Sequence, residues 1–333
     1  MDIYYSASII NPTYNEQETI GECLSNIIEE SKKFDSEIIV VDDNSSDQTI
    51  EIVEKFKTIK LVKLDSNKGV GNARNVGAKI AKHEVLCFID ADVIITSNSI
   101  VNLIKKLNQS SNIGSVSAIQ EMVNLNTKDW SSNFVCLKSC YGFENVEKET
   151  EFSLCTAEFS VVSKETLNQV GGWKPLRNAG GEEFYLGYKI NQLNKKNYKI
   201  INASYKTSYV NLYTRFKRII DRTEKYIHIF LKKKKFDTEG SFATFNQFLS
   251  SLLTLIIIVL ILFSPILDKS LLIAGILASS IFQIVVEFNF LTFAKKHYGL
   301  KMVFFSLYGI HVMNLGIILG VVYFIFRKIF FIK

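Results

Sequence analysis

The sequence predicts an α/β domain with a doubly wound sheet, followed by C-terminal transmembrane helices. Over the first two thirds of the chain, short apolar runs alternate with segments whose apolar residues recur at helical spacing, the pattern of a sheet covered by helices on both faces. Acidic residues come directly after two of these runs. The last third contains three apolar stretches, and each approaches or exceeds the roughly 17–25 residues that a membrane-spanning helix needs.

The first half should contain strands and helices in strict alternation. Its apolar runs predict strands at 6–11, 37–41, 59–64 and 85–89. Helical spacing predicts helices at about 20–28, at about 48–56 behind a capping Asp47, and from the glycine-containing loop 67–75 through Ala81. Such alternation, taken by itself, favours parallel strand pairing.

The middle of the chain gives weaker signals. Strands are expected at 115–119 and 159–162, and 130–143 fits either a helix or a loop. Ser163 is placed to cap a short helix through Leu167, and a further helix should begin at the glycine pair Gly180-Gly181.

A basic amphipathic helix is expected from Tyr213 to Lys235, ahead of spans at 248–263, 271–293 and 302–326. We therefore expect an α/β domain at 1–210, a juxtamembrane segment at 211–240 and a transmembrane region at 241–333. A basic segment next to apolar spans favours docking on an anionic membrane surface. Nucleic-acid binding is not expected, because no nucleic-acid motif accompanies these charges.

The charge distribution predicts the membrane topology only in part. Basic residues before the first span, and those in the second connection, favour a cytoplasmic catalytic domain and a cytoplasmic second connection. Three spans satisfy both conditions but place Arg327, Lys328 and Lys333 outside, against the charge rule, so a re-entrant last segment or a partly embedded first one stays open. Glu287 lies inside the expected second span; it is either a functional charge or a residue at a helix end.

The composition gives further information on net charge, on secretion and on the role of the cysteines. The 333 residues carry 39 Lys and Arg against 33 Asp and Glu, a mild net charge of +6. The first five residues lack the basic start of a secretory signal, so the catalytic part should stay in the cytoplasm. The five cysteines form no metal-like double pair, which favours reduced structural thiols.

The acidic strand ends are the strongest functional signal. Asp90-Ala91-Asp92 follows the run 85–89, and Asp42-Asp43 follows 37–41. Ligands in open α/β sheets bind outside the carboxyl ends of the strands. Neighbouring carboxylates repel each other unless a cation joins them, and Mg²⁺ or Mn²⁺ shared with a diphosphate would do so. Taken alone, an Asp-x-Asp also fits a solvated turn or a helix cap.

Four motifs together resemble family 2 glycosyltransferases over roughly Ile9 to Ile190. They are Pro12-Thr13-Tyr14-Asn15-Glu16, the segment 41–47, the loop 67–77 and Asp90-Ala91-Asp92, in the order and spacing of that family. The resemblance implies a GT-A fold, with a mixed sheet and a nucleotide-sugar donor bound by its N-terminal half.

The resemblance also implies roles for donor-binding residues. Asp43 matches the position that accepts a hydrogen bond from the nucleobase, and a carboxylate suits uracil N3–H, which favours a UDP-sugar. Asp42 fits a helix cap equally well. Pro12, Tyr14 and Glu16 match the loop that lines the nucleoside, with turn formation as the alternative. Arg74 would lie close to the donor diphosphate; the alternative is a surface arginine.

The remaining matched residues concern the metal and the acceptor. Asp92 matches the metal-binding acid, and Asp90 the acid nearer the ribose and the water shell of the metal, which would be Mn²⁺ or Mg²⁺. Glu183 matches the general base of the family's acidic pair, usually an Asp, and Glu182 is the alternative. Trp173 follows Gly171-Gly172, where the family often places an aromatic residue near the acceptor; a core tryptophan is the other interpretation.

These inferences predict a multi-pass, membrane-anchored, metal-dependent glycosyltransferase that inverts the anomeric centre by single displacement. The donor would be a UDP-sugar and the acceptor lipid-linked or membrane-delivered, in cell-envelope glycan or glycolipid synthesis. One alternative is a polyprenyl-phosphate sugar synthase. Another is a catalytically inactive, nucleotide-sugar-binding membrane scaffold.

Overall fold

The computed structural model describes residues 5–125, 129–143, 149–176, 180–234, 236 and 244–330. By internal packing, these residues fall into two compact units. Unit 1 comprises the described residues within 1–125 and 145–208, and unit 2 those within 126–144 and 209–333. The domain boundaries expected near 210 and 240 stay a prediction.

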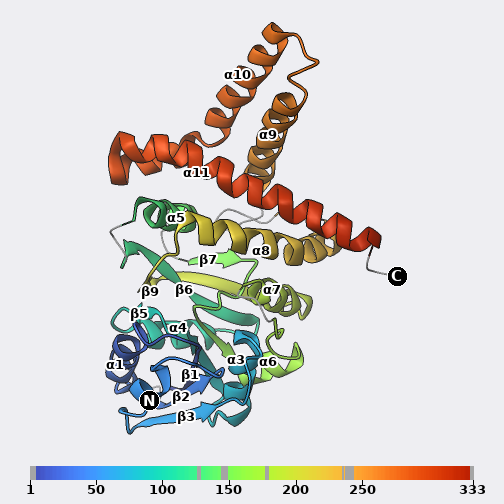
Figure 1. Cartoon of the computed structure of the whole chain (residues 1–333). Coiled ribbons are helices and arrows are strands. Elements are labelled where there is room, and N and C mark those ends of the chain that lie inside the picture. The colour runs from blue at the N-terminus through green and yellow to red at the C-terminus, as the bar shows by residue number, and fades with distance from the viewer. Residues whose placement is uncertain are drawn as a thin grey trace. The chain divides into compact units, whose positions relative to one another are not determined.

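Unit 1 is built on one mixed sheet (Figure 1), in which the described strands follow the order β3-β2-β1-β4-β8-β6-β9-β5, with β7 pairing with β9. Parallel pairing joins β1 to β2 and β4, β2 to β3, and β6 to β9. Antiparallel pairing joins β8 to β4 and β6, and β9 to β5 and β7. The strands are β1 (Ser6–Thr13), β2 (Asp35–Asp42), β3 (Ile59–Lys63), β4 (Val85–Ile89), β5 (Val93–Ile95), β6 (Ile113–Asn124), β7 (Glu149–Phe152), β8 (Phe159–Ser163) and β9 (Lys196–Thr207).

Helices cover both faces of this sheet, because its central strands are apolar on both sides. Ile9 of β1 belongs to the core that includes Ile20 and Ile100, whereas its neighbour Ile10 belongs to the core that includes Ala73 and Leu186. The first face is covered by α1 (Ile20–Ser31), α2 (Thr49–Val53) and α4 (Ser99–Leu107), and the second by α3 (Val70–Ile80), α6 (Lys164–Gln169) and α7 (Glu182–Gln192).

The predicted α/β class, the mixed sheet and the apolar C-terminal helices are confirmed. Purely parallel pairing, favoured by the alternation alone, is wrong, because β8 lies antiparallel between β4 and β6. Ser163 caps α6 as expected, accepting the amide N–H of Thr166 at 3.1 Å. The sequence patterns missed β5, β7 and β9, and the segment 130–143 forms helix α5 (Trp130–Cys140) followed by a 3₁₀ turn at Tyr141–Phe143.

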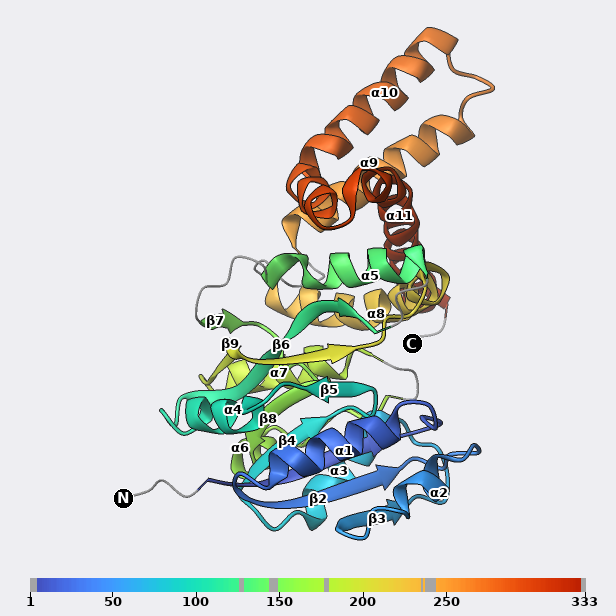
Figure 2. The same ribbon diagram turned by 90° about the vertical axis from the view of Figure 1, so that its left-hand side faces the viewer.

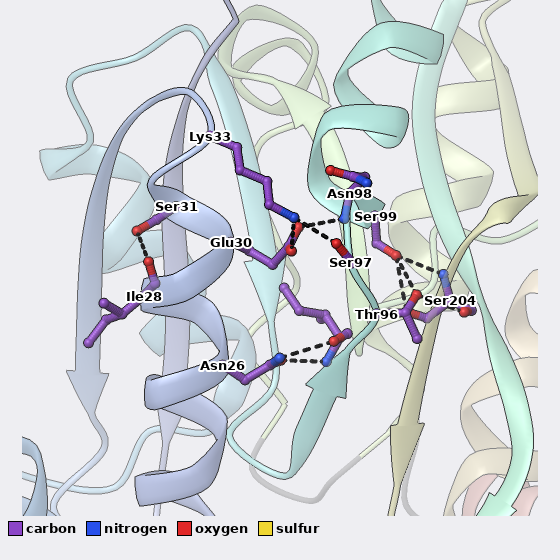
Figure 3. A network of polar contacts seen from close by, with 11 residues as sticks. Asn26, Ile28, Glu30, Ser31, Lys33, Thr96, Ser97, Asn98, Ser99 and Ser204 are labelled. Carbon is purple, nitrogen blue, oxygen red and sulfur yellow. Dashed lines mark hydrogen bonds and ion pairs between the residues drawn. The ribbon is translucent and has the colours of Figure 1, made fainter.

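A polar network fixes the segment that follows the Asp90-Ala91-Asp92 motif (Figure 3). The Asn26 side chain of α1 brackets the backbone of Ile95, accepting its N–H at 2.7 Å and donating to its carbonyl at 3.1 Å. Thr96 and Ser99 bond to Ser204 of β9, with the two hydroxyl oxygens of Thr96 and Ser204 lying 2.9 Å apart. Helix α1 and strand β9 therefore hold β5 in place directly after the acidic motif.

Unit 2 contains α5, α8 (Leu212–Lys233), α9 (Phe245–Leu262), α10 (Lys269–Val286) and α11 (Phe288–Phe330), the last broken at Gly299, whose φ is 75°. Three of these, α9, α10 and α11, are long and apolar enough to span a membrane. The expected second span, 271–293, forms a helix but ends earlier than predicted: α10 ends at Val286, and Glu287 is its C-cap residue. Glu287 is thus the helix-end residue that the sequence left open.

Candidate functional site

The carboxyl ends of β2, β1 and β4 lie side by side, since these strands are adjacent and parallel in the sheet. Register pairs Thr13 with Asp42 across β1 and β2, and Ile10 with Phe88 across β1 and β4. Asp43, the loop beginning at Tyr14, and Asp90 therefore leave the sheet at the same edge, where ligands bind in α/β proteins.

Asp43 holds the start of helix α3. Its side chain is buried, and its two oxygens accept the amide N–H groups of Lys68 at 2.9 Å and Gly69 at 2.7 Å. Gly69 is the N-cap of α3 and adopts a φ of 91°, a conformation that favours glycine. An ionised carboxylate has about four acceptor sites, so Asp43 keeps capacity for a nucleobase N–H. Asp42 instead accepts from the backbone N–H of Ser45 at 3.0 Å and from its hydroxyl, which makes it the cap of a turn, not of a helix.

Arg74, in the second turn of α3, is the central cation of the site. Its side chain is only 1% exposed, so the surface alternative is wrong. One terminal nitrogen lies 2.6 Å from an oxygen of Asp90, and the other lies 3.0 Å from an oxygen of Glu182. The guanidinium carbon lies 4.8 Å from the ring centroid of Trp173. Burial opposes the charge, but the carboxylates of Asp90 and Glu182 outweigh it and raise the pKa of Arg74 above its ordinary value.

Asp90 and Asp92 lie in an excess of negative charge. Burial raises the pKa of Asp90 to about 7, with Arg74 opposing and the carboxylates of Asp92 and Glu158 adding to the shift. Burial and the charges of Glu16 and Glu158 raise the pKa of Asp92 to about 6, while the hydroxyl of Thr207, 3.1 Å away, partly offsets this. A nearby cation would stabilise the ionised form of both carboxyl groups.

These residues fit a divalent cation that also binds the substrate. Among the described residues, no three His, Cys, Asp or Glu side chains are grouped to hold a metal ion by themselves. Mg²⁺ usually needs only one or two carboxylates when substrate phosphates supply further ligands. Asp92 makes no ion pair with any side chain in the described ranges, and one oxygen of Asp90 is left over from its contact with Arg74.

The acidic pair opens helix α7 after two glycines in left-handed conformations, Gly180 with φ 94° and Gly181 with φ 103°. Glu183 is buried and accepts the amide N–H of Gly181 at 2.7 Å. Glu182 uses one oxygen for Arg74, and its other oxygen is buried without a hydrogen-bond partner. Burial, followed by the charge of Glu183, raises the pKa of Glu182. The two carboxylates therefore have different partners. Glu182 is joined to Asp90 through Arg74, an arrangement that we call the Arg74 bridge.

The residues expected to line the nucleoside and the acceptor differ in how deeply they are buried. Pro12 is buried within β1, whereas Tyr14 is 46% exposed. Glu16 accepts from the Thr19 hydroxyl at 2.9 Å, and its charge acts on Asp92. Trp173 is 1% exposed and packs edge-on against Phe88 with ring centroids 5.2 Å apart. This is the core position that the sequence allowed, and an acceptor contact by Trp173 stays a prediction.

Two residues of this site escaped the sequence patterns. Glu158 precedes β8; its carbonyl accepts the Asp90 N–H at 2.9 Å, and its carboxylate accepts from the Tyr205 hydroxyl at 2.6 Å. Thr207, the last residue of β9, contacts Asp92. Both enter through the antiparallel part of the sheet, which the alternation of strands and helices did not indicate.

The chain is similar in sequence to known glycosyltransferases. Residues 8–171 match the family model described as glycosyl transferase family 2. A poly-beta-1,6-N-acetyl-D-glucosamine synthase of Staphylococcus epidermidis is 29% identical over 177 residues, covering 50% of this chain and 41% of that protein. The poly(ribitol-phosphate) beta-N-acetylglucosaminyltransferase TarS of Staphylococcus aureus is 39% identical over 98 residues, covering 28% of this chain and 17% of that one. The chain thus matches less than half the length of these curated relatives.

Solved structures show the same fold. The mannosyltransferase PcManGT of Pyrobaculum calidifontis, in complex with GDP-Man and Mn²⁺, has a TM-score of 0.59 at 18% identity, covering 97% of this chain and 87% of that one. GalNAc-T7 with UDP, GalNAc and Mn²⁺ has a TM-score of 0.54 at 17% identity, covering 69% of this chain and 48% of that one.

Proposed function

Residues 8–171 make this chain a member of glycosyl transferase family 2, and on that premise we propose that it transfers a sugar from a UDP-sugar to a lipid-linked or membrane-delivered acceptor. The transfer inverts the anomeric centre in one displacement. The setting is cell-envelope glycan or glycolipid synthesis, in line with the names of the staphylococcal relatives. The C-terminal apolar helices anchor the enzyme in a membrane, with the catalytic part on the cytoplasmic side.

The observation that carries the proposal is the Arg74 bridge. Arg74 contacts Asp90 at the end of β4 and Glu182 at the start of α7, and α3 begins on the carboxylate of Asp43. The short helix α3 therefore connects the residue proposed to bind the nucleobase, the residue proposed to lie near the ribose, and the acidic pair. Tyr14 and Glu16 line the nucleoside beside Asp43 in this proposal.

Asp92 and Asp90 would hold Mn²⁺ or Mg²⁺. When bound, such an ion acts as a Lewis acid on the departing nucleoside diphosphate. In this proposal Arg74 fixes the orientation of the Asp90 carboxylate and also keeps positive charge beside the diphosphate.

Glu183 is the proposed general base. Glu182 is bound by Arg74, and Glu183, the next residue of α7, accepts the Gly181 N–H with one oxygen. The base takes the proton of the acceptor hydroxyl as its oxygen attacks the anomeric carbon. General base catalysis contributes typically 10²–10⁴-fold to the rate.

A release assay over a panel of nucleotide-sugars, with membrane lipid extract as acceptor, tests the proposal. UDP-N-acetylglucosamine comes first, because both staphylococcal relatives are named for that sugar. We expect UDP release that needs Mn²⁺ or Mg²⁺ and is lost in Asp92→Asn. The exposed Asp65→Asn is the control and should keep full activity. Full activity of Asp92→Asn would contradict the metal assignment, and no turnover with any donor would favour the inactive scaffold.

The Glu183→Gln variant distinguishes the proposed enzyme from a polyprenyl-phosphate sugar synthase. A hydroxyl acceptor must lose its proton, so the substitution should slow turnover by about 10²-fold or more. A phosphate acceptor is already ionised, so the same variant would barely slow that enzyme. Glu165→Gln on the exposed side of α6 is the control. A wild-type rate for Glu183→Gln would favour the phosphate acceptor.

A further inference from the structure

Helices α9 and α10 form a hairpin of membrane-spanning length. Each has 18 residues, about 27 Å at 1.5 Å per residue, close to the roughly 30 Å of a bilayer's hydrocarbon core. They are joined by the connection 263–268, where Ile266 is 78% exposed. The base of the hairpin is the other end, where α9 begins and α10 ends.

The middle of α11 is bonded to this base. Asn314 is the central residue of the apolar segment 302–326 that was expected to be the third span. Its side chain accepts from Gln247 at 2.7 Å and donates to the Ser250 hydroxyl at 3.0 Å, both in the first two turns of α9. Ser250 in turn donates to Glu287, the residue that caps α10, at 2.7 Å.

This connection argues against a third span parallel to the hairpin. If α11 crossed the bilayer, Asn314 would lie near the midplane, yet its bonds to Gln247, Ser250 and Thr254 reach only the first three turns of α9, on the side of the base. Figures 1 and 2 show α11 running across the base of the hairpin, not alongside it. The segment 302–326 carries no Asp, Glu, Lys or Arg, so both of its halves need apolar surroundings.

A charged helix covers one side of α11. Gly316 and Gly320 lie against α8: a Cβ at Gly316 would lie 3.2 Å from the side chains of Phe216 and Ile219, and one at Gly320 would lie 2.7 Å from the carbonyl of Ile220. Near its end, Arg327 pairs with Glu224 of α8 at 2.9 Å. Since α8 also carries exposed basic residues such as Lys217 and Arg218, it cannot enter the hydrocarbon core cheaply.

The opposite side of α11 is apolar and open. Phe304 is 71% exposed, Val322 55% and Phe326 50%. Aromatic residues are enriched where a protein meets the membrane–water interface. The exposed apolar surface continues into the hairpin, where Leu271 is 69% exposed.

We propose that only α9 and α10 span the membrane, and that α11 lies in the plane of the cytoplasmic leaflet, between its acyl chains and the basic helix α8. The partner of the exposed apolar side of α11 is therefore the interface of an anionic bilayer. This arrangement keeps Lys301 and Arg327, at the two ends of the apolar segment, on the same side as α8, which removes the conflict with the charge rule. The inference rests on the proposed membrane anchoring.

Cysteine labelling of the full-length chain in intact cells tests this topology. The single substitutions are Ile266→Cys in the connection, Lys301→Cys before the apolar segment and Lys328→Cys after it. The five native cysteines are buried, so the parent chain is the low-background control. With a membrane-impermeant maleimide, we expect Ile266→Cys to label in intact cells and the other two only after permeabilisation.

Each other result is equally informative. Labelling of Lys328→Cys together with Ile266→Cys, but not Lys301→Cys, would show that α11 crosses and would overturn the proposal. Three positions on one side, with the protein still in the membrane pellet after alkaline carbonate, would show that the hairpin does not span. Release of the protein by carbonate would refute the anchoring itself.

Depth measurement gives a second, independent readout. Nitroxide labels at Phe304→Cys, Leu315→Cys and Phe326→Cys, in vesicles containing anionic lipid, report immersion through collisions with oxygen and a water-soluble nickel complex. An in-plane helix places the three labels within about 5 Å of the same depth. A spanning helix would place Phe304 and Leu315, eleven residues apart, about 16 Å apart in depth, which would overturn the proposal.

Discussion

Replacing Arg74 by methionine should strongly destabilise the catalytic unit. The substitution keeps an unbranched side chain of comparable length in the core but removes the side chain that pairs with both Asp90, at 2.6 Å, and Glu182, at 3.0 Å. The side chains of Arg74 and Glu182 are 1% and 6% exposed. Removing one partner of such a buried pair costs about 3–5 kcal/mol, mostly because the remaining charge stays buried. For a unit of this size, that lowers the unfolding midpoint by roughly 6–20 °C.

Thermal unfolding followed by intrinsic fluorescence would measure this loss. The chain has two tryptophans, and Trp173 lies against Arg74. Arg74→Lys keeps the charge without the fork, so we expect an intermediate midpoint. Lys63→Met, which breaks the exposed pair with Glu54, is the control and should leave the midpoint unchanged. A midpoint for Arg74→Met within about 2 °C of the wild type would refute this reasoning.

Three further predictions concern packing, thiols and pH. Gly187→Ala should cost about 1–3 kcal/mol in the free energy of unfolding, because its Cβ would lie 2.6 Å from the backbone of Leu154, whereas Gly21→Ala meets nothing closer than 3.5 Å and should be neutral. Burial raises the pKa of the Cys23, Cys87 and Cys155 thiols, so mass spectrometry should find them unalkylated by iodoacetamide at pH 8 until the chain is denatured. Burial opposes ionisation of Glu37, but the Ser8 hydroxyl and the Lys82 N–H outweigh it and lower its pKa. Its stabilisation is therefore present at neutral pH and lost as pH falls through that lowered pKa, so Glu37→Gln should melt below the wild type at pH 7 and converge with it in acid; a constant difference would contradict this.

Strands β1, β2 and β4 could be predicted because each contains a continuous apolar run buried on both faces, whereas β3 is only partly buried. Strand β9 could not, because its buried positions include the polar residues Asn197 and Lys199, so the sequence shows no alternation of apolar and polar residues there. Strand β5 has only three residues, and β7 is a largely exposed pair with β9. The antiparallel half of the sheet therefore depends on long-range pairing that no local pattern reports.

The site was predicted as a set of motifs but not as a connected structure. The acidic ends of β2 and β4 follow from strand periodicity. The Arg74–Glu182 contact joins residues 108 positions apart, and nothing in either local sequence indicates it. Glu287 shows the same limit: an apolar stretch interrupted by one acid fits a charged span or a helix end, and the end of α10 at Val286 distinguishes them.

Strand β9 imposes an order on biosynthesis. It pairs with β5, β6 and β7, so those strands cannot complete the sheet before Thr207 has left the ribosome. Contacts that span more than 100 residues, such as Thr96 to Ser204, also close slowly. At about 5–20 residues per second, the hydrophobic hairpin follows within seconds. Membrane insertion and closure of the catalytic sheet therefore compete in time, and a nascent chain stalled before residue 207 should remain protease-sensitive throughout β5–β7.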